Sequence, residues 1–230
     1  YKSRQQPVTD ADISIDIFLR NHFKKITPEF GWVSEESKDD FSRFNSEFFW
    51  CLDPIDGTRS YINGNPEYTI SLALIKQNTP VIGMILNPET EEFFTARKGL
   101  GALCNRKKIE VNQSKSCDEY IYAISSSEEK KLRSFKSINK NEILLMGSIA
   151  YKIALVAKGQ IDIALSFTKK NDWDIAAANI ILEEAGGITK SMSGGSIYFN
   201  TKEMKIDSIL ASNFSIISEL VKKFKISSNE

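Results

Sequence analysis

The first hundred residues carry one amphipathic segment followed by short apolar runs. Between Thr9 and Ile26, apolar residues recur at positions 15, 18, 19, 23 and 26, and this spacing predicts a helix. Thr9 can cap that helix, and Thr27-Pro28 would end it. Four β-like runs come next, at residues 48–53, 68–75, 80–86 and 91–97. Because Asn, Gly or Pro separates these runs, the region is predicted to form an antiparallel sheet.

The pattern changes after about residue 115, where β-like runs alternate with helical ones. The β-like runs lie at 120–127, 142–148, 161–167 and 208–212, and the helical ones at 148–159, within 174–187 and at 214–224. Strands alternating with helices are typical of α/β proteins. We therefore predict an α+β N-terminal subdomain, residues 1–115, and an α/β C-terminal subdomain, residues 116–230. The boundary between them is soft and lies near residues 110–118.

Composition places the chain among ordinary globular proteins. Of its 230 residues, 41% are hydrophobic and 26% are charged, which excludes a disordered or collagen-like chain. The 30 Lys and Arg residues balance 30 Asp and Glu residues, so the basic excess of a nucleic-acid-binding protein is missing. No apolar run approaches the ~18 residues of a membrane span. We expect neither nucleic acid nor a membrane as a partner.

The histidine and cysteine residues narrow the chemistry further. The single histidine, His22, lies on the predicted N-terminal helix, where a place on the helix face is favoured over catalysis. Cys51, Cys104 and Cys117 are odd in number and have no C-x-x-C spacing, so we expect reduced thiols in a cytoplasmic protein. The sequence begins at Tyr1 without a Met, and we expect its N-terminus to be trimmed or incomplete.

Four acidic features stand at predicted edges of strands or helices. They are Asp10 with Asp12, Glu35-Glu36 in WVSEES, Asp53 with Asp56 in LDPIDGT, and Asp174 after Trp173. In LDPIDGT, two carboxylates and the Ile55 carbonyl can turn towards one point, and hard oxygen ligands of this kind suit Mg²⁺. Gly57 lets the backbone approach a ligand. Thr58 offers a hydroxyl and a cap for a short helix whose N–H groups would hold a phosphate.

Each acidic feature also has an ordinary structural explanation. LDPIDGT fits an Asx turn, Asp174 fits a helix N-cap, and Glu35-Glu36 fits a solvated acidic loop. Their combination matters because two like charges ~4 Å apart cost about 4 kcal/mol at an effective dielectric constant near 20. A fold that gathers Glu35, Asp53, Asp56 and Asp174 would therefore need cations. Spacing alone leaves open whether these residues gather.

Three motifs in this order, WVSEES, LDPIDGT and WDIAAANIILEEAGG, resemble those of the inositol monophosphatase family of Mg²⁺-dependent, lithium-sensitive phosphatases. The resemblance extends from PVTDAD at Pro7 to the last predicted helix. It implies an alternating αβαβα sandwich with the active site between its halves. It also implies two or three Mg²⁺ ions per site, a small phosphate ester as the substrate, and a homodimer.

The resemblance further implies a role for each motif residue. The expected metal ligands are Glu35, Asp53, the Ile55 carbonyl, Asp56 and Asp174. Glu35 and Thr58 would orient and activate the attacking water with support from Asp12, and metal ions would neutralise the phosphoryl group. The expected substrate contacts are Asp56, the N–H groups of Gly57 and Thr58, and the segment of Gly147, Ser148 and Ile149.

The motifs define the substrate less well. Inositol-phosphate enzymes of this family usually carry a Glu shortly before Trp-Asp, whereas residues 166–172 here contain Lys169 and Lys170 and no Glu. Arg59 and Lys152 resemble residues of bacterial 3′(2′),5′-bisphosphate nucleotidases. Lys169 and Lys170 would suit a substrate with a second phosphate, and a solvated loop explains these two lysines about equally well. We expect 3′-phosphoadenosine 5′-phosphate as the substrate, with inositol 1-phosphate as the alternative.

Two other functions compete with this one. A haloacid-dehalogenase-type phosphatase needs two acids two residues apart, but Asp53 and Asp56 are three apart, so we reject it. A metal- or phosphate-binding module that has lost catalysis stays open. The intact set of Glu35, Asp53, Asp56, Thr58 and Asp174 argues against that module.

Overall fold

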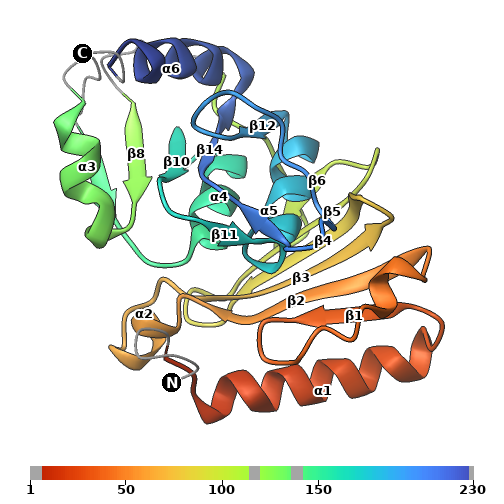
Figure 1. The fold of residues 1–230 in the computed structure, drawn as a ribbon. Helices are drawn as coiled ribbons and strands as arrows, with labels where there is room; N and C mark the ends of the chain where they lie inside the picture. The colour runs from red at the N-terminus through yellow and green to blue at the C-terminus, as the bar shows by residue number, and fades with distance from the viewer. Residues whose placement is uncertain (1–6, 114–119, 136–141, 228–230) are drawn as a thin grey trace.

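The computed structural model describes residues 7–113, 120–135 and 142–227. Two β-sheets alternate with three layers of helices (Figure 1). In order, the layers are α1 (Asp10–Ile26), a seven-stranded sheet, α4 (Ile149–Ala157) with α5 (Asp172–Glu184), a five-stranded sheet, and α3 (Glu129–Ser134) with α6 (Phe214–Ser227). The expected αβαβα sandwich is confirmed.

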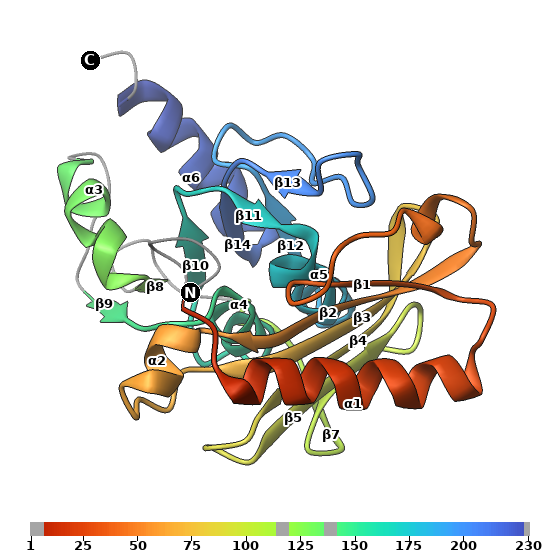
Figure 2. The same cartoon turned by 60° about the horizontal axis from the view of Figure 1, so that its bottom comes forward.

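Helix α1 forms where the hydrophobic spacing predicts it. Thr9 is its N-cap, and the Asp12 carboxylate accepts hydrogen bonds from the Thr9 N–H at 2.7 Å and the Thr9 hydroxyl at 2.6 Å. The helix ends at Ile26, directly before Thr27-Pro28. Phe23 packs on Trp50 with 4.2 Å between ring centroids, and α1 runs along the outer face of the first sheet (Figure 2).

The first sheet contains seven strands in chain order. They are β1 (Gly31–Ser34), β2 (Phe48–Asp56), β3 (Thr69–Lys76), β4 (Thr79–Asn87), β5 (Glu92–Arg97), β6 (Ala102–Cys104) and β7 (Lys107–Ile109). All neighbouring strands are antiparallel except β1 and β2, which run parallel with Ser34 beside Leu52. The prediction of a purely antiparallel sheet missed β1. Because parallel strands end at the same edge, this pair brings Glu35 and Asp53 side by side.

The second sheet is mixed and has the strand order β12-β14-β10-β8-β9. Its strands are β8 (Ile121–Ile124), β9 (Glu142–Leu145), β10 (Ile163–Ser166), β12 (Gly187–Lys190) and β14 (Ile209–Asn213). Strand β8 runs parallel to both β9 and β10, whereas β14 is antiparallel to its neighbours. A separate ribbon pairs β11 (Lys170–Asn171) with β13 (Lys205–Ile206) and leads directly into α5.

Helix α5 is buried between the two sheets, which explains its run of alanines. A Cβ atom on Gly83 of β4 would lie 2.5 Å from the Ala177 carbonyl oxygen, so strand and helix backbones approach closely. At the start of the helix, the Ser71 hydroxyl of β3 donates to the Trp173 carbonyl at 3.4 Å. These contacts hold the first turn of α5 against the sheet from which Asp53 projects.

The division into two subdomains stays a prediction. Its boundary falls partly on residues 114–119, which lie outside the described residues together with Cys117. Helices α4 and α5 come from the C-terminal half and share one hydrophobic core with the first sheet. Within the described ranges, no helix is both long enough and apolar enough to cross a membrane.

Candidate active site

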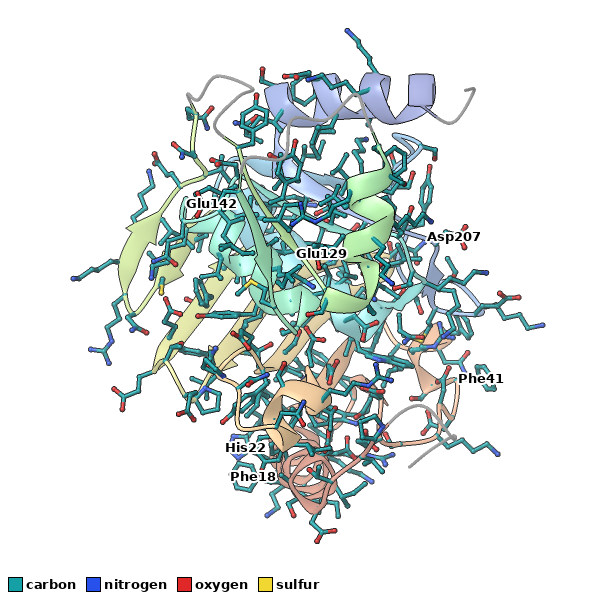
Figure 3. The ribbon with its side chains drawn as sticks, turned by 90° about the vertical axis from the view of Figure 1, so that its left-hand side faces the viewer. Phe18, His22, Phe41, Glu129, Glu142 and Asp207 are labelled. Atoms are coloured by element: carbon teal, nitrogen blue, oxygen red, sulfur yellow. The ribbon has the colours of Figure 1, made fainter. Side chains whose placement is uncertain are left out.

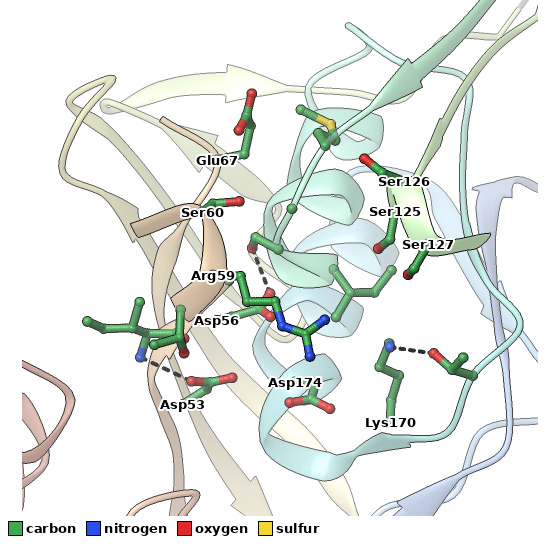
Figure 4. A pocket seen from close by; sticks show the side chains of 18 of the residues that line it. Asp53, Asp56, Arg59, Ser60, Glu67, Ser125, Ser126, Ser127, Lys170 and Asp174 are labelled. Atoms are coloured by element: carbon green, nitrogen blue, oxygen red, sulfur yellow. Dashed lines mark hydrogen bonds between the residues drawn. The ribbon is translucent and has the colours of Figure 1, made fainter. Parts of the chain in front are cut away.

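A cavity of about 850 Å³ opens between the two halves of the chain. Its walls come from the end of β2, the short helix α2 (Thr58–Ile62), the first turns of α4 and α5, and the segment after β8 (Figure 4). Every predicted site residue except Asp12 lines this cavity. The fold therefore brings together motifs that are up to 139 positions apart, from Glu35 to Asp174.

Three carboxylates meet at one end of the cavity. Glu35 follows β1, and its N–H donates to the Leu52 carbonyl at 3.1 Å. Asp53 lies on β2 where the pairing with β3 becomes irregular, and Asp174 lies in the first turn of α5. One carboxylate oxygen from each of Glu35, Asp53 and Asp174 lies within 4.8 Å of the others. The sequence motifs thus converge as the resemblance implied.

The electrostatics of this cluster favour a bound cation. Burial, followed by the charges of Glu35 and Asp56, raises the pKa of Asp53 well above its usual range. Burial and the charge of Asp56 raise the pKa of Asp174 to about 7. Two full negative charges 4.8 Å apart repel by about 3.5 kcal/mol at an effective dielectric constant of 20. Oxygen ligands under such repulsion fit a hard divalent cation such as Mg²⁺.

Asp56 lies beside this cluster but is held by α4. Its Oδ2 accepts hydrogen bonds of 2.6 Å from the Ser148 hydroxyl and from the Ala150 N–H. Burial raises the pKa of Asp56, and these two hydrogen bonds with the charges of Lys152 and Lys170 act in the opposite direction. One oxygen of Asp56 is therefore committed to the start of α4, and the other is available to the cavity.

The turn between Asp53 and Thr58 combines both interpretations of LDPIDGT. The Ile55 N–H donates to Asp53 Oδ1 at 3.1 Å, which is the Asx turn, and the turn still directs both carboxylates into the cavity. The Thr58 hydroxyl donates to the Ile55 carbonyl at 3.0 Å. Thr58 is not the cap expected for the short helix, because Gly57 occupies the N-cap position. Gly57 has a φ of 97°, which favours glycine.

Asp174 is not the N-cap of its helix either. The N-cap of α5 is Asn171, whose N–H donates to Asp174 Oδ2 at 2.7 Å. Asp174 is the third helical residue and forms a capping box with Asn171. This arrangement fixes the carboxylate that faces Asp53 and Glu35.

Asp12 is the predicted site residue that the cavity does not reach. It is buried at the start of α1, where its carboxylate is bonded to Thr9, as the sequence pattern of a capping box allows. Its negative charge still contributes to the raised pKa of Asp53, so the two carboxylates are electrostatic neighbours.

The predicted substrate segment forms a tight corner at the start of α4. A Cβ atom on Gly147 would lie 2.1 Å from the Ser60 hydroxyl, so only glycine fits there. Ser148 has a φ of 48°, and its hydroxyl accepts from the Tyr151 N–H at 3.0 Å as the N-cap of α4. A non-glycine residue in this left-handed region is strained, and Ile149 follows on the same wall of the cavity.

The basic residues near the cavity differ from one another. Lys170 lines the wall facing Asp174, and its Nζ donates to the Thr168 hydroxyl at 2.9 Å. Lys169 is 71% exposed and pairs with Asp207 at 3.4 Å. Figure 4 shows the Arg59 guanidinium reaching over the cavity towards Asp174 and Lys170. Lys152 is buried behind the cavity wall.

Several residues of this region carried no recognisable motif. Ser125, Ser126, Ser127 and Glu128 line the wall opposite the carboxylates, and the sequence predicted only the end of a strand there. The run of three serines beside a Glu was the one available signal. The run follows β8, and the pairing of β8 with β9 and β10, which a single sequence does not reveal, places it at the cavity.

A second group missed by the sequence supports the site from behind. Arg43, buried in the short 3-10 helix Ser42–Phe44 between β1 and β2, donates from Nη1 to Asn200 Oδ1 at 2.6 Å and from Nε to Asp39 Oδ2 at 2.9 Å. The Asn200 N–H donates to Asp172 Oδ2 at 2.6 Å. These bonds connect the loop after β1 to the first turn of α5, which carries Asp174.

The remaining candidates for chemistry lie away from the cavity. His22 is exposed on α1 and stacks near Phe18 at 6.5 Å, as expected for a helix-face residue (Figure 3). Cys51 and Cys104 are free and buried. Burial, helped by the charges of Asp172 and Asp174, raises the pKa of the Cys51 thiol. A thiol with a raised pKa is a poor nucleophile.

Comparison with known proteins agrees with this geometry. Residues 1–226 match the sequence profile of the inositol monophosphatase family. A fructose-1,6-bisphosphatase/inositol-1-monophosphatase of Aquifex aeolicus is 31% identical, with 81% of this chain and 73% of that protein covered. The 3′(2′),5′-bisphosphate nucleotidase CysQ of Aggregatibacter actinomycetemcomitans is 30% identical, with coverage of 88% and 78%. The solved IMPase of Thermotoga maritima has a TM-score of 0.86 at 27% identity, with coverage of 99% and 86%.

Proposed function

The chain belongs to the inositol monophosphatase family of metal-dependent phosphatases, and we propose that it hydrolyses a small phosphate monoester with Mg²⁺ as its cofactor. The observation that carries this proposal is the approach of Glu35, Asp53 and Asp174 to within 4.8 Å at one end of a polar cavity. Without a cation, burial and mutual repulsion raise the pKa values of Asp53 and Asp174, whereas a bound divalent cation would let both stay ionised.

The residues that would hold Mg²⁺ are Glu35, Asp53, Asp174, Asp56 and the Ile55 carbonyl. A divalent cation in such a site lowers the pKa of bound water and offsets charge on the phosphoryl oxygens. Their oxygens are hard ligands, and two of the carboxylates are held by hydrogen bonds within their own turns. That pre-organisation supports one fixed ligand arrangement rather than a diffuse acidic surface.

The protein's own groups can activate and aim the attacking water. Because the Thr58 hydroxyl donates to the Ile55 carbonyl, its oxygen faces the cavity as an acceptor for a water hydrogen. The Glu35 carboxylate lines the same end of the cavity and can take the proton that the water loses. The water oxygen then bonds to phosphorus as the ester bond breaks, and the alkoxide leaves. The N–H groups of Gly57 and Thr58 can hold the phosphate, and Asp12 would support the water from behind.

We infer that the substrate carries a second anionic group, with 3′-phosphoadenosine 5′-phosphate as the first candidate. Lys170 and Arg59 both line the cavity, and cations there suit a second phosphate. Lys169 supports this less, because it pairs with Asp207 and is mostly exposed. Lys152 reaches the cavity only through a neighbouring side chain.

A specific observation favours a polyol phosphate such as inositol 1-phosphate as the second candidate. Among the described residues that line the cavity, none is Phe, Tyr or Trp, so no ring is available to stack on a base. The lining instead carries many hydroxyl and amide groups, which suit a polyhydroxylated substrate. The relatives named above include proteins named for both substrate types.

Phosphate release from four compounds would test the proposal. They are inositol 1-phosphate, fructose 1,6-bisphosphate, 3′-phosphoadenosine 5′-phosphate and adenosine 3′-phosphate, each assayed with Mg²⁺, with EDTA and with added Li⁺. We expect Mg²⁺-dependent, Li⁺-inhibited release that is fastest with a bisphosphate. Release from none of them would favour the non-catalytic binding module, and release unaffected by EDTA would refute the metal site.

Two further expectations accompany this function. The buried free thiols of Cys51 and Cys104 support a reducing compartment, so we propose a cytoplasmic enzyme. A homodimer is proposed from the family resemblance, and sedimentation of the purified protein would test it.

A further inference from the structure

Glu35 and Asp174 come from distant parts of the chain, and one stretch, residues 200–206, is bonded to both parts. On the side of Asp174, β13 in this stretch pairs with β11, directly before α5 (Figure 2). The Asp172 N–H at the start of α5 also donates to the Met204 carbonyl at 3.2 Å. The structure describes all of residues 200–206, and none of them lines the cavity. The stretch therefore supports Asp174 from outside the site.

On the side of Glu35, the buried Arg43 binds this stretch to the segment between β1 and β2. Its guanidinium donates to Asn200 Oδ1 at 2.6 Å and to the carbonyls of residues 201–202 at 3.1 and 3.3 Å. Its Nε pairs with the carboxylate of Asp39, four residues after Glu35, at 2.9 Å. A buried guanidinium with several acceptors holds them in fixed relative positions, because its donors form a rigid fork.

The backbone of Arg43 is packed directly on β1. A Cβ atom on Gly31, the first residue of that strand, would lie 3.0 Å from the Arg43 Cα. Strand β1 is four residues long, and Glu35 follows it. The segment that carries Glu35 is therefore held at Arg43 both by backbone packing and by the bond to Asp39.

Asn200 is the junction of these contacts. Its Oδ1 accepts from Arg43, its Nδ2 donates to the Gln77 carbonyl at 2.8 Å, and its N–H donates to Asp172 Oδ2 at 2.6 Å. Its φ of 59° lies in the left-handed region, which Asn tolerates better than most non-glycine residues. One residue thus joins the segment after β1, the turn between β3 and β4, and the first turn of α5.

We propose that Arg43 and Asn200 form a tether that positions the metal ligands Glu35 and Asp174 relative to each other. Ionised carboxylates within 4.8 Å repel, so the segments that carry them need a connection that holds before a cation binds. Without the tether, part of the free energy of metal binding would go into bringing these two ligands together. The proposal rests on the proposed Mg²⁺-dependent function and extends it to positioning residues outside the cavity.

Asn200→Gly tests the tether without changing any charge. Glycine suits the left-handed backbone and keeps the N–H that Asp172 accepts, but it removes both side-chain bonds. Mg²⁺ alone would be titrated into metal-free protein while the melting temperature is followed. We expect the Mg²⁺ dissociation constant to rise about tenfold over wild type. In phosphate release, the Mg²⁺ concentration for half-activation should rise equally, with kcat at saturating Mg²⁺ within about threefold.

Arg43→Lys provides a second variant, because it keeps the charge and loses the fork. It should weaken Mg²⁺ binding to a similar extent, and the double variant should bind Mg²⁺ no more weakly than the weaker single one. Either single variant is sufficient for the test if the other fails to fold.

Asn213→Ala is the matched control, because the buried Asn213 also joins distant segments but lies outside the cavity lining. Its Nδ2 donates to the Asn112 carbonyl at 2.7 Å, and its Oδ1 accepts from the Ile216 N–H at 2.8 Å. The control should lower the melting temperature in EDTA and leave the Mg²⁺ dissociation constant within about twofold of wild type.

The tether would be refuted if Asn200→Gly bound Mg²⁺ as tightly as wild type, if Asn213→Ala weakened Mg²⁺ binding as much, or if the two single effects added in the double variant. In each of these cases the phosphatase proposal would survive. A wild type that Mg²⁺ neither stabilises nor activates would instead refute the metal site, and the tether with it.

Discussion

Replacing Asp174 by Asn is expected to stabilise the metal-free protein at pH 8 and to abolish its stabilisation by Mg²⁺. The substitution keeps the shape of the side chain and an oxygen that can accept from the Asn171 N–H. It removes one of the three negative charges that lie within 4.8 Å of one another. When metal ligands repel one another, removing one of them should stabilise the metal-free protein and weaken metal binding.

The expected gain in the free energy of unfolding follows from the pKa of Asp174, which rises from 3.8 to about 7 in the fold. Full ionisation in a site of this kind costs about 4 kcal/mol. Asp174 keeps some contact with solvent, so screening reduces the expected gain to about 2 kcal/mol. Because the folded pKa is raised, this cost is absent below pH 4, grows as pH rises towards 7, and is complete above it. The gain from Asp174→Asn should therefore be larger at pH 8 than at pH 5.

Guanidinium denaturation in EDTA at pH 5 and pH 8 would measure the gain for the variant against wild type. The same denaturation with Mg²⁺ at 100 times its dissociation constant should raise the free energy of unfolding of wild type by about 2.7 kcal/mol. It should change that of the variant little. Asp162→Asn is the control, because Asp162 is a buried acid outside the cluster that accepts from the Ile121 N–H. It should lose stability at both pH values. The reasoning fails if Asp174→Asn is less stable than wild type in EDTA at pH 8.

Three other predictions follow from the same geometry. Lys170→Met should raise KM for a bisphosphate about tenfold and Lys169→Met less than twofold, because of these two lysines only Lys170 is held facing Asp174. Equal effects of the two variants in steady-state assays would contradict this. Arg43→Met should lower the free energy of unfolding by about 3–5 kcal/mol, because it leaves buried acceptors without their donor. A loss below about 1 kcal/mol in denaturation curves would contradict this prediction. Glu35→Gln should lower kcat at least about 100-fold with the fold retained by circular dichroism, because a base and a metal ligand are lost together; retained activity would refute both roles.

Local patterns predicted the elements that depend on local chemistry. Helix α1 has an apolar period and a Thr9 cap, and both appear as expected. The strands around LDPIDGT and the helix after Trp173 were also predictable to within a few residues. Strand β1 was not, because its four residues acquire their identity from parallel pairing with β2.

The site was predictable as a set of residues but not as a geometry. Motif order indicated Glu35, Asp53 and Asp174, whereas their approach depends on β1 pairing with β2 and on the packing of α5. The difference between Lys169 and Lys170 arises at β11, where β13 brings Asp207 close to the first lysine. Adjacent residues of the same type gave no hint of it.

Contacts between distant segments were the least accessible from sequence. Arg43 reaches Asn200 across 157 positions, and Lys152 reaches Ser125 across 27. For Lys152 the sequence offered only a resemblance to a residue of bisphosphate nucleotidases, and the fold buries this lysine behind the cavity wall. Which side chains are buried depends on how the layers stack, and one sequence does not determine that by pattern alone.

Magnesium titration of phosphate release tests the central claim most directly. EDTA-treated wild type and Asp53→Asn would be titrated with Mg²⁺ on whichever compound wild type hydrolyses fastest. A metal site built on Asp53 predicts saturable activation of wild type from a negligible baseline and at least a hundredfold lower rate for the variant at every Mg²⁺ concentration. Release that is independent of Mg²⁺, or a variant activated like wild type, would contradict the account.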